Sequence, residues 1–303
     1  LYLAEKEISD ITQRRFAKPV SKMSDVLQCT RDYIESLHEG DSKLTGIPTG
    51  FIELDEKICG LQKGELIIIA ARPSMGKTSL ALNIADHVGA NLKNPMLFFS
   101  MELSAQQISQ NMLCSTVRID TNLMRTGKIS DNDWSKLSLA MEELSKSEIF
   151  IDDTPKLSFL EIRAKAKRLK LQHDIQLVII DYLQLIEARR TENRKQEISD
   201  ITRNLKALAM ELNVPVIAVS QLDRSVETRE GHTPRISDMR ESGSIEQDAD
   251  VIILLHREDY YDSTKRQGEV ELNIAKQKNG PTGKTTLAFH QRFLRFENLT
   301  VIL

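Results

Sequence analysis

The sequence predicts an α/β domain with a mainly parallel central sheet flanked by helices and an antiparallel C-terminal extension. Two observations predict this class. From Thr45 onward, short and nearly all-apolar runs alternate with helical patterns, as is typical of strands buried on both faces of a parallel sheet. After Leu255 the strand signals follow one another closely and are separated by turn signals such as Asn279-Gly280-Pro281, which favours antiparallel pairing.

Five apolar runs are expected to form the parallel strands. They span residues 65–70, 95–100, 176–181, 214–220 and 251–255. The clearest helical pattern between them repeats apolar residues at three- and four-residue spacing, at Ile198, Ile201, Leu205, Leu208 and Leu212. The extension is expected to add strands at 269–275, 284–290, 293–296 and 299–303. Residues 44–303 are therefore expected to form one domain.

Residues 1–43 differ in character, because they are charged, helical in pattern and without strand signals. An amphipathic helix is expected between Ser21 and His38, with an apolar stripe formed by Met23, Val26, Leu27, Thr30, Ile34 and Leu37. Ser21 or Ser24 can cap it and Gly40 can end it. The stripe either packs on its own domain or docks on a neighbouring subunit. Because the chain begins with Leu1 rather than Met, we expect a fragment whose N-terminal part is missing.

Composition narrows the function classes. With 303 residues, 40% of them apolar, a sizeable core is possible. The net charge of −3 does not indicate a nucleic-acid partner, so DNA binding would need a local surface. The cysteines Cys29, Cys59 and Cys114 lie far apart, which excludes a disulfide framework or a zinc motif and suits a reducing cytoplasm. No apolar run is long enough for a membrane span, so no membrane association is expected.

The strongest local signal is a phosphate-binding loop at residues 71–78, read as Ala-Arg-Pro-Ser-Met-Gly-Lys-Thr. It follows an apolar strand and precedes a helical run, which is the context that such a loop requires. Lys77 is expected to reach the β- and γ-phosphates of ATP, and the Thr78 hydroxyl to bind Mg²⁺. Ala71 stands where the pattern usually has glycine. The expected nucleotide-binding residues are Ala71, Arg72, Pro73, Ser74, Met75, Gly76, Lys77, Thr78 and Ser79.

Hydrolysis needs further groups, and three strand ends supply candidates. Asp181 ends an apolar strand, where an acidic residue can hold the metal. Glu102 follows another strand and can accept a proton from water, although it can equally be a residue of a helix N-terminus. Gln221 ends a third strand and is either a sensor of the γ-phosphate or a polar residue satisfied by nearby backbone.

With these elements in this order, the chain resembles the DnaB-type replicative helicases. The resemblance runs from about residue 47 to residue 296 and is carried by the segments at 70–78, 100–104, 180–185, 219–224, 240–250 and 276–280. It implies a RecA-like P-loop NTPase fold, a homohexameric ring with active sites at subunit boundaries, and 5′-to-3′ movement on single-stranded DNA. It also implies a primase and a helicase loader as partners. Residues 21–38 are similar to the linker helix of that family, which favours docking on a neighbour.

The resemblance also assigns roles to single residues. It makes Glu102 the water-orienting base, Asp181 the metal-shell acid and Gln221 the phosphate sensor. Arg240, Glu241 and Gly243 match the loop that contacts the DNA backbone, and Lys276 and Lys278 match the positions that reach the neighbour's nucleotide. Lys278 stands where the family usually has an arginine finger, and lysine lacks the planar fork of arginine. Asn111 replaces a common arginine and is not expected to be a site residue.

Two segments are candidates for the DNA surface. Residues 188–195 carry Arg189, Arg190, Arg194 and Lys195 against Glu192 alone, and they form either a DNA-binding loop or a solvated one. Residues 222–243 mix both charges, so binding there would rest on Arg240 and on backbone N–H groups near Gly243. Neither segment offers aromatic rings for base stacking, which predicts phosphate contacts with little sequence preference.

Three rival functions share parts of this pattern. A RecA-like recombinase is also an ATPase on DNA, but the linker-like helix and residues 240–250 speak against it. A nucleotide-gated scaffold with little turnover would fit Lys278 and Asn111, yet it needs neither Glu102 nor Asp181. A small-molecule kinase would need an acceptor pocket and a lid, for which the sequence offers no candidate.

Overall fold

The structure, a computed structural model, describes residues 22–39, 44–187, 194–239 and 242–299. The chain divides into two units, Leu1–Thr45 and Gly46–Leu303. The first unit contains helix α2 (Met23–Glu39), as the sequence predicts. The side chains of Met23, Val26, Leu27 and Ile34 are exposed on it. The predicted capping residues Ser21 and Gly40 lie outside the described residues.

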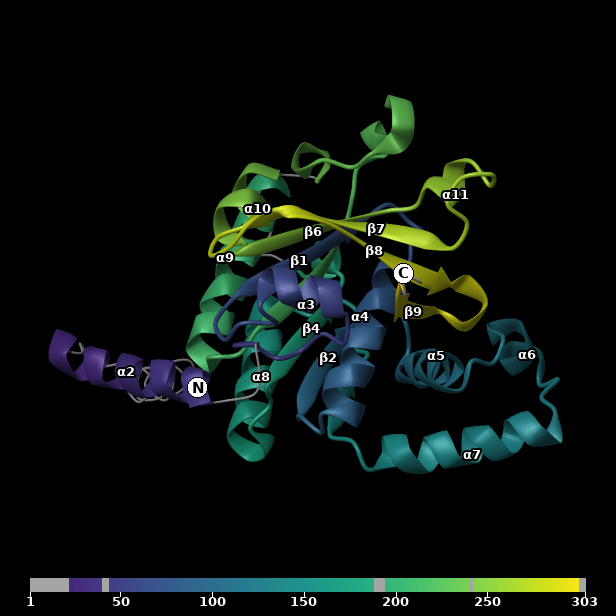
Figure 1. Cartoon of the computed structure of the whole chain (residues 1–303), viewed down its shortest axis with the longest axis horizontal. Helices are drawn as coiled ribbons and strands as arrows, with labels where there is room; N and C mark the ends of the chain where they lie inside the picture. The colour runs from purple at the N-terminus through teal and green to yellow at the C-terminus, as the bar shows by residue number, and fades with distance from the viewer. Residues whose placement is uncertain (1–21, 40–43, 188–193, 240–241, 300–303) are drawn as a thin grey trace, which may run out of the picture. The chain divides into compact units, whose positions relative to one another are not determined.

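The second unit is built on one sheet, whose nine described strands run in the order β3-β2-β4-β5-β1-β6-β7-β8-β9 (Figure 1). The first six strands are parallel and the last three are antiparallel. In this order the bounds are Ile149–Asp152, Met96–Ser100, Leu177–Asp181, Val216–Gln221, Leu66–Ala71, Val251–His256, Glu269–Gln277, Gly283–His290 and Arg295–Asn298. The predicted fold class is therefore confirmed.

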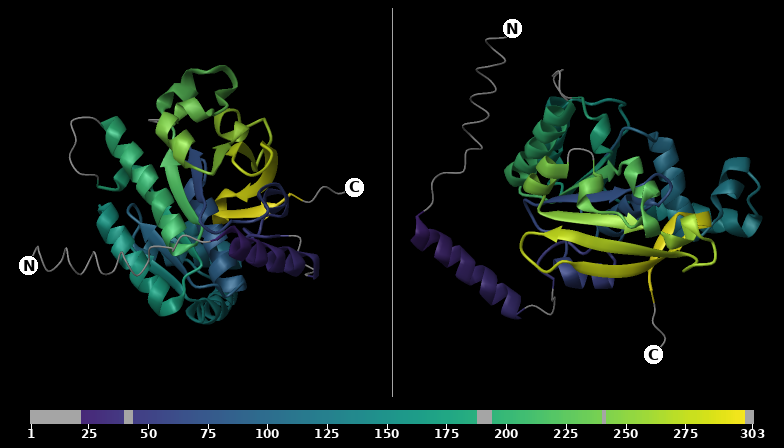
Figure 2. Two further views of the ribbon diagram at one scale, coloured as in Figure 1. Left: turned by 90° about the vertical axis from the view of Figure 1, so that its left-hand side faces the viewer. Right: turned by 90° about the horizontal axis from the view of Figure 1, so that it is seen from above.

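Helices cover both faces of the sheet (Figure 2). Successive residues of a strand point to opposite faces, so each strand contributes side chains to two apolar cores. Ile67 and Ile69 of β1 belong to one apolar core, together with residues of α3, α4 and α5. Leu66 and Ile68 belong to the other core, together with residues of α8, α9 and α10. These helices span Ile52–Ile58, Lys77–Asp86, Ala105–Val117, Phe159–His173, Arg194–Leu212 and Ser242–Asp248. Helices α6 (Thr121–Thr126) and α7 (Asp131–Ser145) form a smaller apolar cluster with α5, and α11 (Glu258–Tyr261) follows β6.

The predicted strands are observed with small differences. The five parallel runs all form strands, but the sequence reading missed β3, an edge strand that is only half-buried. The predicted strand at 293–296 is wrong at its start, because residues 291–293 form a helical turn and Leu294 has a φ of 54°. β9 therefore begins at Arg295. Leu299 is not part of a strand, and residues 300–303 lie outside the described residues.

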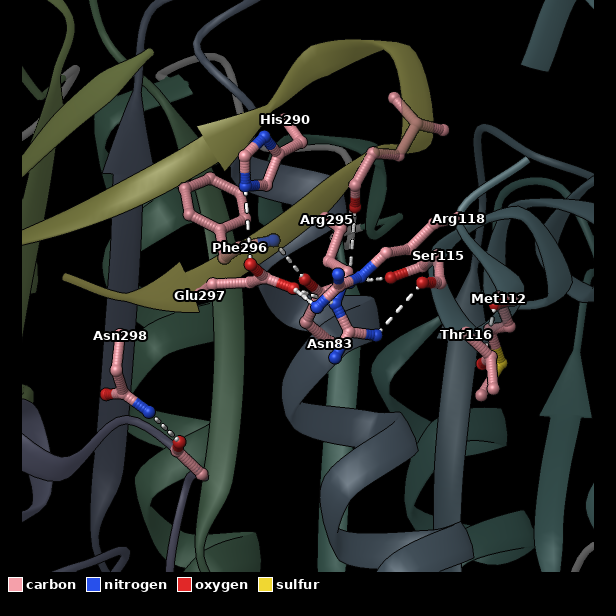
Figure 3. A network of polar contacts seen from close by, with 12 residues as sticks. Asn83, Met112, Ser115, Thr116, Arg118, His290, Arg295, Phe296, Glu297 and Asn298 are labelled. Atoms are coloured by element: carbon pink, nitrogen blue, oxygen red, sulfur yellow. Dashed lines mark hydrogen bonds and ion pairs between the residues drawn. The ribbon is translucent and has the colours of Figure 1, made fainter. Parts of the chain in front are cut away.

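A polar network attaches β9 to helices α4 and α5 (Figure 3). The Oδ1 atom of Asn83 accepts a hydrogen bond from the backbone N–H of Phe296 at 2.6 Å. The Nδ2 atom of Asn83 donates to the Leu294 carbonyl at 3.2 Å and to the Ser115 hydroxyl at 3.1 Å. The Arg118 and Arg295 guanidinium groups lie 2.6 and 2.7 Å from Glu297. This network attaches the turn before β9 to α4 at Asn83.

Among the described residues, no helix combines the length and the apolar character that crossing a bilayer demands.

The network predicts a specific loss of stability. In Asn83→Ala the Phe296 N–H and the Leu294 carbonyl lose their side-chain partner, so the free energy of unfolding should fall by about 1–3 kcal/mol. Denaturant titration measures this change. Asn91→Ala is the control, since exposed Asn91 makes only one long contact, 3.5 Å from its Nδ2 atom to His87. Equal losses in the two variants would contradict the role given to Asn83.

Candidate nucleotide-binding site

The phosphate-binding loop joins β1 to α4 and has a backbone that demands glycine. Gly76 has a φ of 95°, and a Cβ atom there would lie 2.9 Å from Cζ of Phe296. Ser74 also has a positive φ, of 65°. The loop leads directly into the first turn of α4, whose N–H groups have no partners within the helix. Such a loop and helix end can bind an anion.

Ala71 stands where the usual pattern has glycine, and its position in the structure shows why alanine fits there. It is the last residue of β1, where it pairs with Gln221 of β5, and it is fully buried. An extended strand residue has room for a Cβ atom, so this position does not require glycine. Met75 is also buried in the core, so only its backbone can face a ligand.

One lysine lies between two carboxylates at the floor of the site. The Nζ atom of Lys77 is 3.8 Å from Oε2 of Glu102 and 3.8 Å from Oδ1 of Asp181. It also lies 4.9 Å from the ring centroid of Tyr182. The structure thus brings together the three charged residues that the sequence placed on separate strand ends. A triphosphate bound beside Lys77 would have an acidic group on each side.

Asp181 has a hydrogen-bond partner for only one of its two carboxylate oxygens. Its side chain is 1% exposed, and Oδ2 accepts a hydrogen bond from the Thr78 hydroxyl at 2.7 Å. Oδ1 is buried and accepts no hydrogen bond. Burial raises the pKa of Asp181, while Lys77 and Thr78 oppose this shift and Glu102 adds to it. Oδ1 and the Thr78 oxygen are hard donors of the kind that Mg²⁺ prefers.

Glu102 lies in the turn between β2 and α5 rather than in a helix. Helix α5 begins at Ala105, and its N-cap residue is Ser104. The Ser100 hydroxyl closes the turn by donating to the Leu103 carbonyl at 2.6 Å. The Glu102 side chain is 53% exposed, so its carboxylate can contact water at the site. The alternative reading of Glu102 as a helix N-terminal residue is therefore wrong.

Gln221 is positioned from two sides. As the end of β5 it lies beside Ala71, and its side chain lines the same cavity as Lys77 and Glu102. The Gln184 side chain contacts its backbone, donating to the Gln221 carbonyl at 3.2 Å and accepting from the Gln221 N–H at 3.3 Å. Gln184 follows Asp181 by three residues. It therefore connects the strand of the acid to the strand of the amide.

The cavity has a volume of about 480 Å³, and the C-terminal extension supplies one of its walls. Phe289, Gln291 and Leu294 line it together with the phosphate-binding loop. The sequence reading missed these residues, because their place depends on the packing of β8 and β9 over α4. The alternation of Leu287 and Phe289 with more polar residues along β8 was the available signal, since it indicates a strand with one buried face.

Lys276 and Lys278 lie away from this cavity. Lys276 pairs with Ile252 near the start of β6, and the Lys278 N–H bonds to the Asp250 carbonyl. The phosphate-binding loop follows the other end of the neighbouring strand β1, so a strand length of roughly 20 Å separates the two places. The Lys276 ammonium donates to the Glu246 and Ala249 carbonyls at the end of α10. Neither lysine can serve the phosphate-binding loop of its own subunit.

Most of the predicted DNA-binding residues lie outside the described residues, namely Arg189, Arg190, Arg240 and Glu241. Two others are placed in helices. Arg194 is the first residue of α9, so the predicted loop 188–195 ends before it. Gly243 is exposed in the first turn of α10, directly after the segment that holds Arg240.

Comparisons with known proteins agree on one family. Residues 46–298 match the family model described as DnaB-like helicase C terminal domain. The chain is 50% identical over 299 residues to "Replicative DNA helicase DnaB" of Geobacillus stearothermophilus, covering 98% of this chain and 66% of the relative. It is 49% identical to "Replicative DNA helicase DnaC" of Bacillus subtilis (strain 168), with the same coverage of both chains. The chain thus spans 66% of the length of these curated relatives.

Two solved structures are similar to this one. The first is "ATPase Domain of G40P", with a TM-score of 0.88 and 38% identity, which covers 93% of this chain and all of that one. The second is "The Structure Of A DnaB-Like Replicative Helicase And Its Interactions With Primase", with a TM-score of 0.84 and 36% identity, covering 98% and 72% of the two chains. The chain therefore belongs to the family of the DnaB-like helicase C-terminal domain.

Proposed function

We propose that this chain is the motor of a replicative DNA helicase, which hydrolyses ATP and moves 5′-to-3′ on single-stranded DNA as a homohexameric ring. One observation carries the proposal: Lys77 lies 3.8 Å from both Glu102 and Asp181, in a cavity that Gln221 also lines. A motor needs a phosphate clamp, a metal anchor, a base for water and a sensor at one place. Membership of the helicase family supports the same function.

ATP and Mg²⁺ are the cofactors that we assign to the cavity. Residues Ser74 to Ser79 would hold the phosphates through backbone N–H groups and the Lys77 ammonium. The free Oδ1 atom of Asp181 and the Thr78 hydroxyl fit a magnesium ion, which would neutralise charge on the β- and γ-phosphates. Glu102 would orient water and accept its proton from the exposed side of the cavity. Phe289, Gln291 and Leu294 would border the nucleoside.

Lys276 and Lys278 would complete the site of a neighbouring subunit. They lie at the sheet edge opposite to the phosphate-binding loop, so a ring in which one edge faces the other would bring them to the next nucleotide. Lys278 is 65% exposed, with its Nζ atom 3.9 Å from Asp250, and is available for that contact. A lysine gives charge without the fork of an arginine, so this ring would hydrolyse ATP more slowly than one with arginine there.

The DNA would contact the segment from Leu222 to Gly243 at its end, through Arg240 and Gly243, and would also pass over residues 189–194. Gln221 directly precedes the first of these segments, so loss of the γ-phosphate can change the position of Arg240 through the chain between them. Gly243 and the start of α10 would offer backbone N–H groups to the phosphates. Arg189, Arg190 and Arg194 would add local positive charge in the ring channel. A primase and a helicase loader would meet the ring in the cytoplasm.

Residues 1–43 would link subunits through α2. A single helix cannot bury its own apolar stripe, and Met23, Leu27 and Ile34 are exposed. The second unit exposes apolar side chains on α7, including Trp134 and Met141, which lie seven residues apart and so share a helix face. We infer that α2 of one subunit packs on α7 of the next.

The motor function is tested by unwinding of a forked duplex and by ATP turnover, on protein whose hexameric state has been checked. Lys77→Ala should abolish turnover and unwinding together, because it removes the phosphate clamp. Arg240→Ala should keep basal turnover and lose the stimulation by single-stranded DNA. Strand exchange without unwinding would favour a recombinase, and negligible turnover with or without DNA would favour a scaffold. Either result would contradict the proposal.

The raised pKa of Asp181 predicts two opposite effects of pH. The metal needs the carboxylate, so at magnesium concentrations well below saturation the turnover should fall as the pH falls through the raised pKa of Asp181. Without metal, the folded protein favours the protonated acid, so the stability contributed by Asp181 is present at low pH and lost as the pH rises through the raised pKa.

Thermal unfolding of metal-free wild type and Asp181→Asn, between about pH 4 and pH 7, measures the second effect. The stability of the wild type relative to the variant should decline as the pH rises, while Asp181→Asn has no magnesium-dependent turnover. A relative stability that rises with pH would show that the pKa of Asp181 is lowered instead.

Docking of α2 is tested by Leu27→Glu, which places a charge on the apolar stripe. Assembly should weaken by about tenfold or more, because the carboxylate would be buried without a partner. The control is Ser24→Glu, on the polar side of the same helix, which should assemble as the wild type does. Trp134 is the chain's single tryptophan, so its fluorescence should also change on assembly. Unchanged assembly and fluorescence in Leu27→Glu would exclude this interface.

A further inference from the structure

One residue of the phosphate-binding loop has its side chain committed elsewhere. The Arg72 side chain is only 9% exposed. Its Nη1 atom donates to the Leu222 carbonyl at 2.8 Å. Its Nε and Nη2 atoms donate to Oε1 of Glu227 at 3.0 and 2.6 Å. All three guanidinium nitrogens therefore contact the chain that follows Gln221.

That chain, residues 222–239, is here called the sensor loop, and it is closed on itself. Leu222 pairs with Met239 at its two ends, and the Asp223 N–H bonds to the Asp238 carbonyl at 2.7 Å. Inside the loop, Arg229 holds the buried Asp238 carboxylate with hydrogen bonds of 2.7 and 2.8 Å. A loop fixed in this way moves as one body. A displacement near Leu222 or Glu227 therefore reaches Met239, the residue before Arg240.

The sensor loop has a second attachment, to the helix that follows β6. The His232 ring stacks on Tyr261 of α11, with ring centroids 4.0 Å apart. Helix α11 follows β6 after one intervening residue, Arg257. The loop is thus held at one point by the β6 side of the sheet and at another by the phosphate-binding loop.

We propose that Arg72 is a positioning residue that couples the phosphate-binding loop to the DNA-contacting segment, through Leu222 and Glu227. The proposal rests on the proposed function, because it takes Arg240 to contact DNA. A buried guanidinium cannot leave its acceptors without a large cost in desolvation. Any shift of the phosphate-binding loop on nucleotide binding or release must therefore move the sensor loop with it. Gln221 reports the γ-phosphate itself, whereas Arg72 reports the backbone that surrounds the phosphates.

Glu227→Ala tests the coupling without touching the nucleotide cavity, since Glu227 does not line it. The matched control is Glu230→Ala, because Glu230 is an exposed acid of the same loop and its loss changes the net charge equally. On the assembled ring, ATP turnover is measured with and without saturating single-stranded DNA, together with the KM for ATP. DNA affinity is compared in ADP and in a non-hydrolysable ATP analogue. Thermal unfolding of each variant confirms that the ring is folded.

The expected result for Glu227→Ala is basal turnover and KM close to the wild type, with the DNA stimulation reduced about fivefold or more. The ratio of DNA affinities between the two nucleotide states should shrink by a similar factor. Glu227→Gln keeps the acceptor Oε1 and should recover part of the stimulation. Glu230→Ala should behave as the wild type.

Two results would overturn the coupling role of Arg72. One is full DNA stimulation in Glu227→Ala. The other is a proportional fall of basal and stimulated turnover, which would mean that the contact only supports the fold. If the wild-type ring itself shows no stimulation by DNA, the proposed function fails, and the coupling role fails with it.

Discussion

The alignment of parallel strand ends is the constraint on which the site depends. Ser100 of β2 is in register with Asp181 of β4, and Ala71 of β1 is in register with Gln221 of β5. Residues at the carboxyl ends of adjacent parallel strands must emerge at one edge of the sheet. Backbone pairing therefore brings the strand ends that carry Glu102, Asp181 and Gln221 to the phosphate-binding loop, while the Ser100 hydroxyl and the Gln184 side chain fix the local geometry. The apolar residues that bury these strands on both faces are thus a condition for the chemistry.

The same register buries the Asp181 carboxylate at a place where the protein alone does not supply hydrogen-bond partners for both oxygens. Asp181 is buried with one oxygen unbonded, and Lys77 is nearly buried at 3.8 Å, which is longer than a direct hydrogen bond. A buried carboxylate without full compensation is costly to the fold. That cost is reduced when a cation or a phosphate ligand supplies the missing partner. The site is thus less stable without its ligand, and this difference contributes to ligand affinity.

The sequence predicted the strands that end at the nucleotide site well, but it predicted the elements and side-chain contacts around them less well. Runs such as 177–180 are apolar throughout, so the strands and their terminal residues could be found without knowing the neighbours. β3 was missed because its half-buried residues give a weaker signal, and the strand at 293–296 was misplaced because Leu294 takes a left-handed conformation. Arg72 was expected among the nucleotide-binding residues, and the sequence did not indicate that its side chain is bonded to Leu222 and Glu227. The direction of a side chain depends on tertiary contacts that lie 150 residues or more away along the chain.

The residues predicted to contact the nucleotide do not all lie at one place in a single subunit. The groups that would bind nucleotide lie at one edge of the parallel sheet, while Lys276 and Lys278 lie at the opposite edge. Parallel strands joined by continuous hydrogen bonds and packed between two apolar cores make a body that is stiff compared with its loops. Such a body can carry a displacement from one edge to the other, but it cannot bring the two edges together. A lone subunit is therefore expected to bind nucleotide with an incomplete set of cations. Assembly would then be part of the active site itself, because the missing charge must come from another copy.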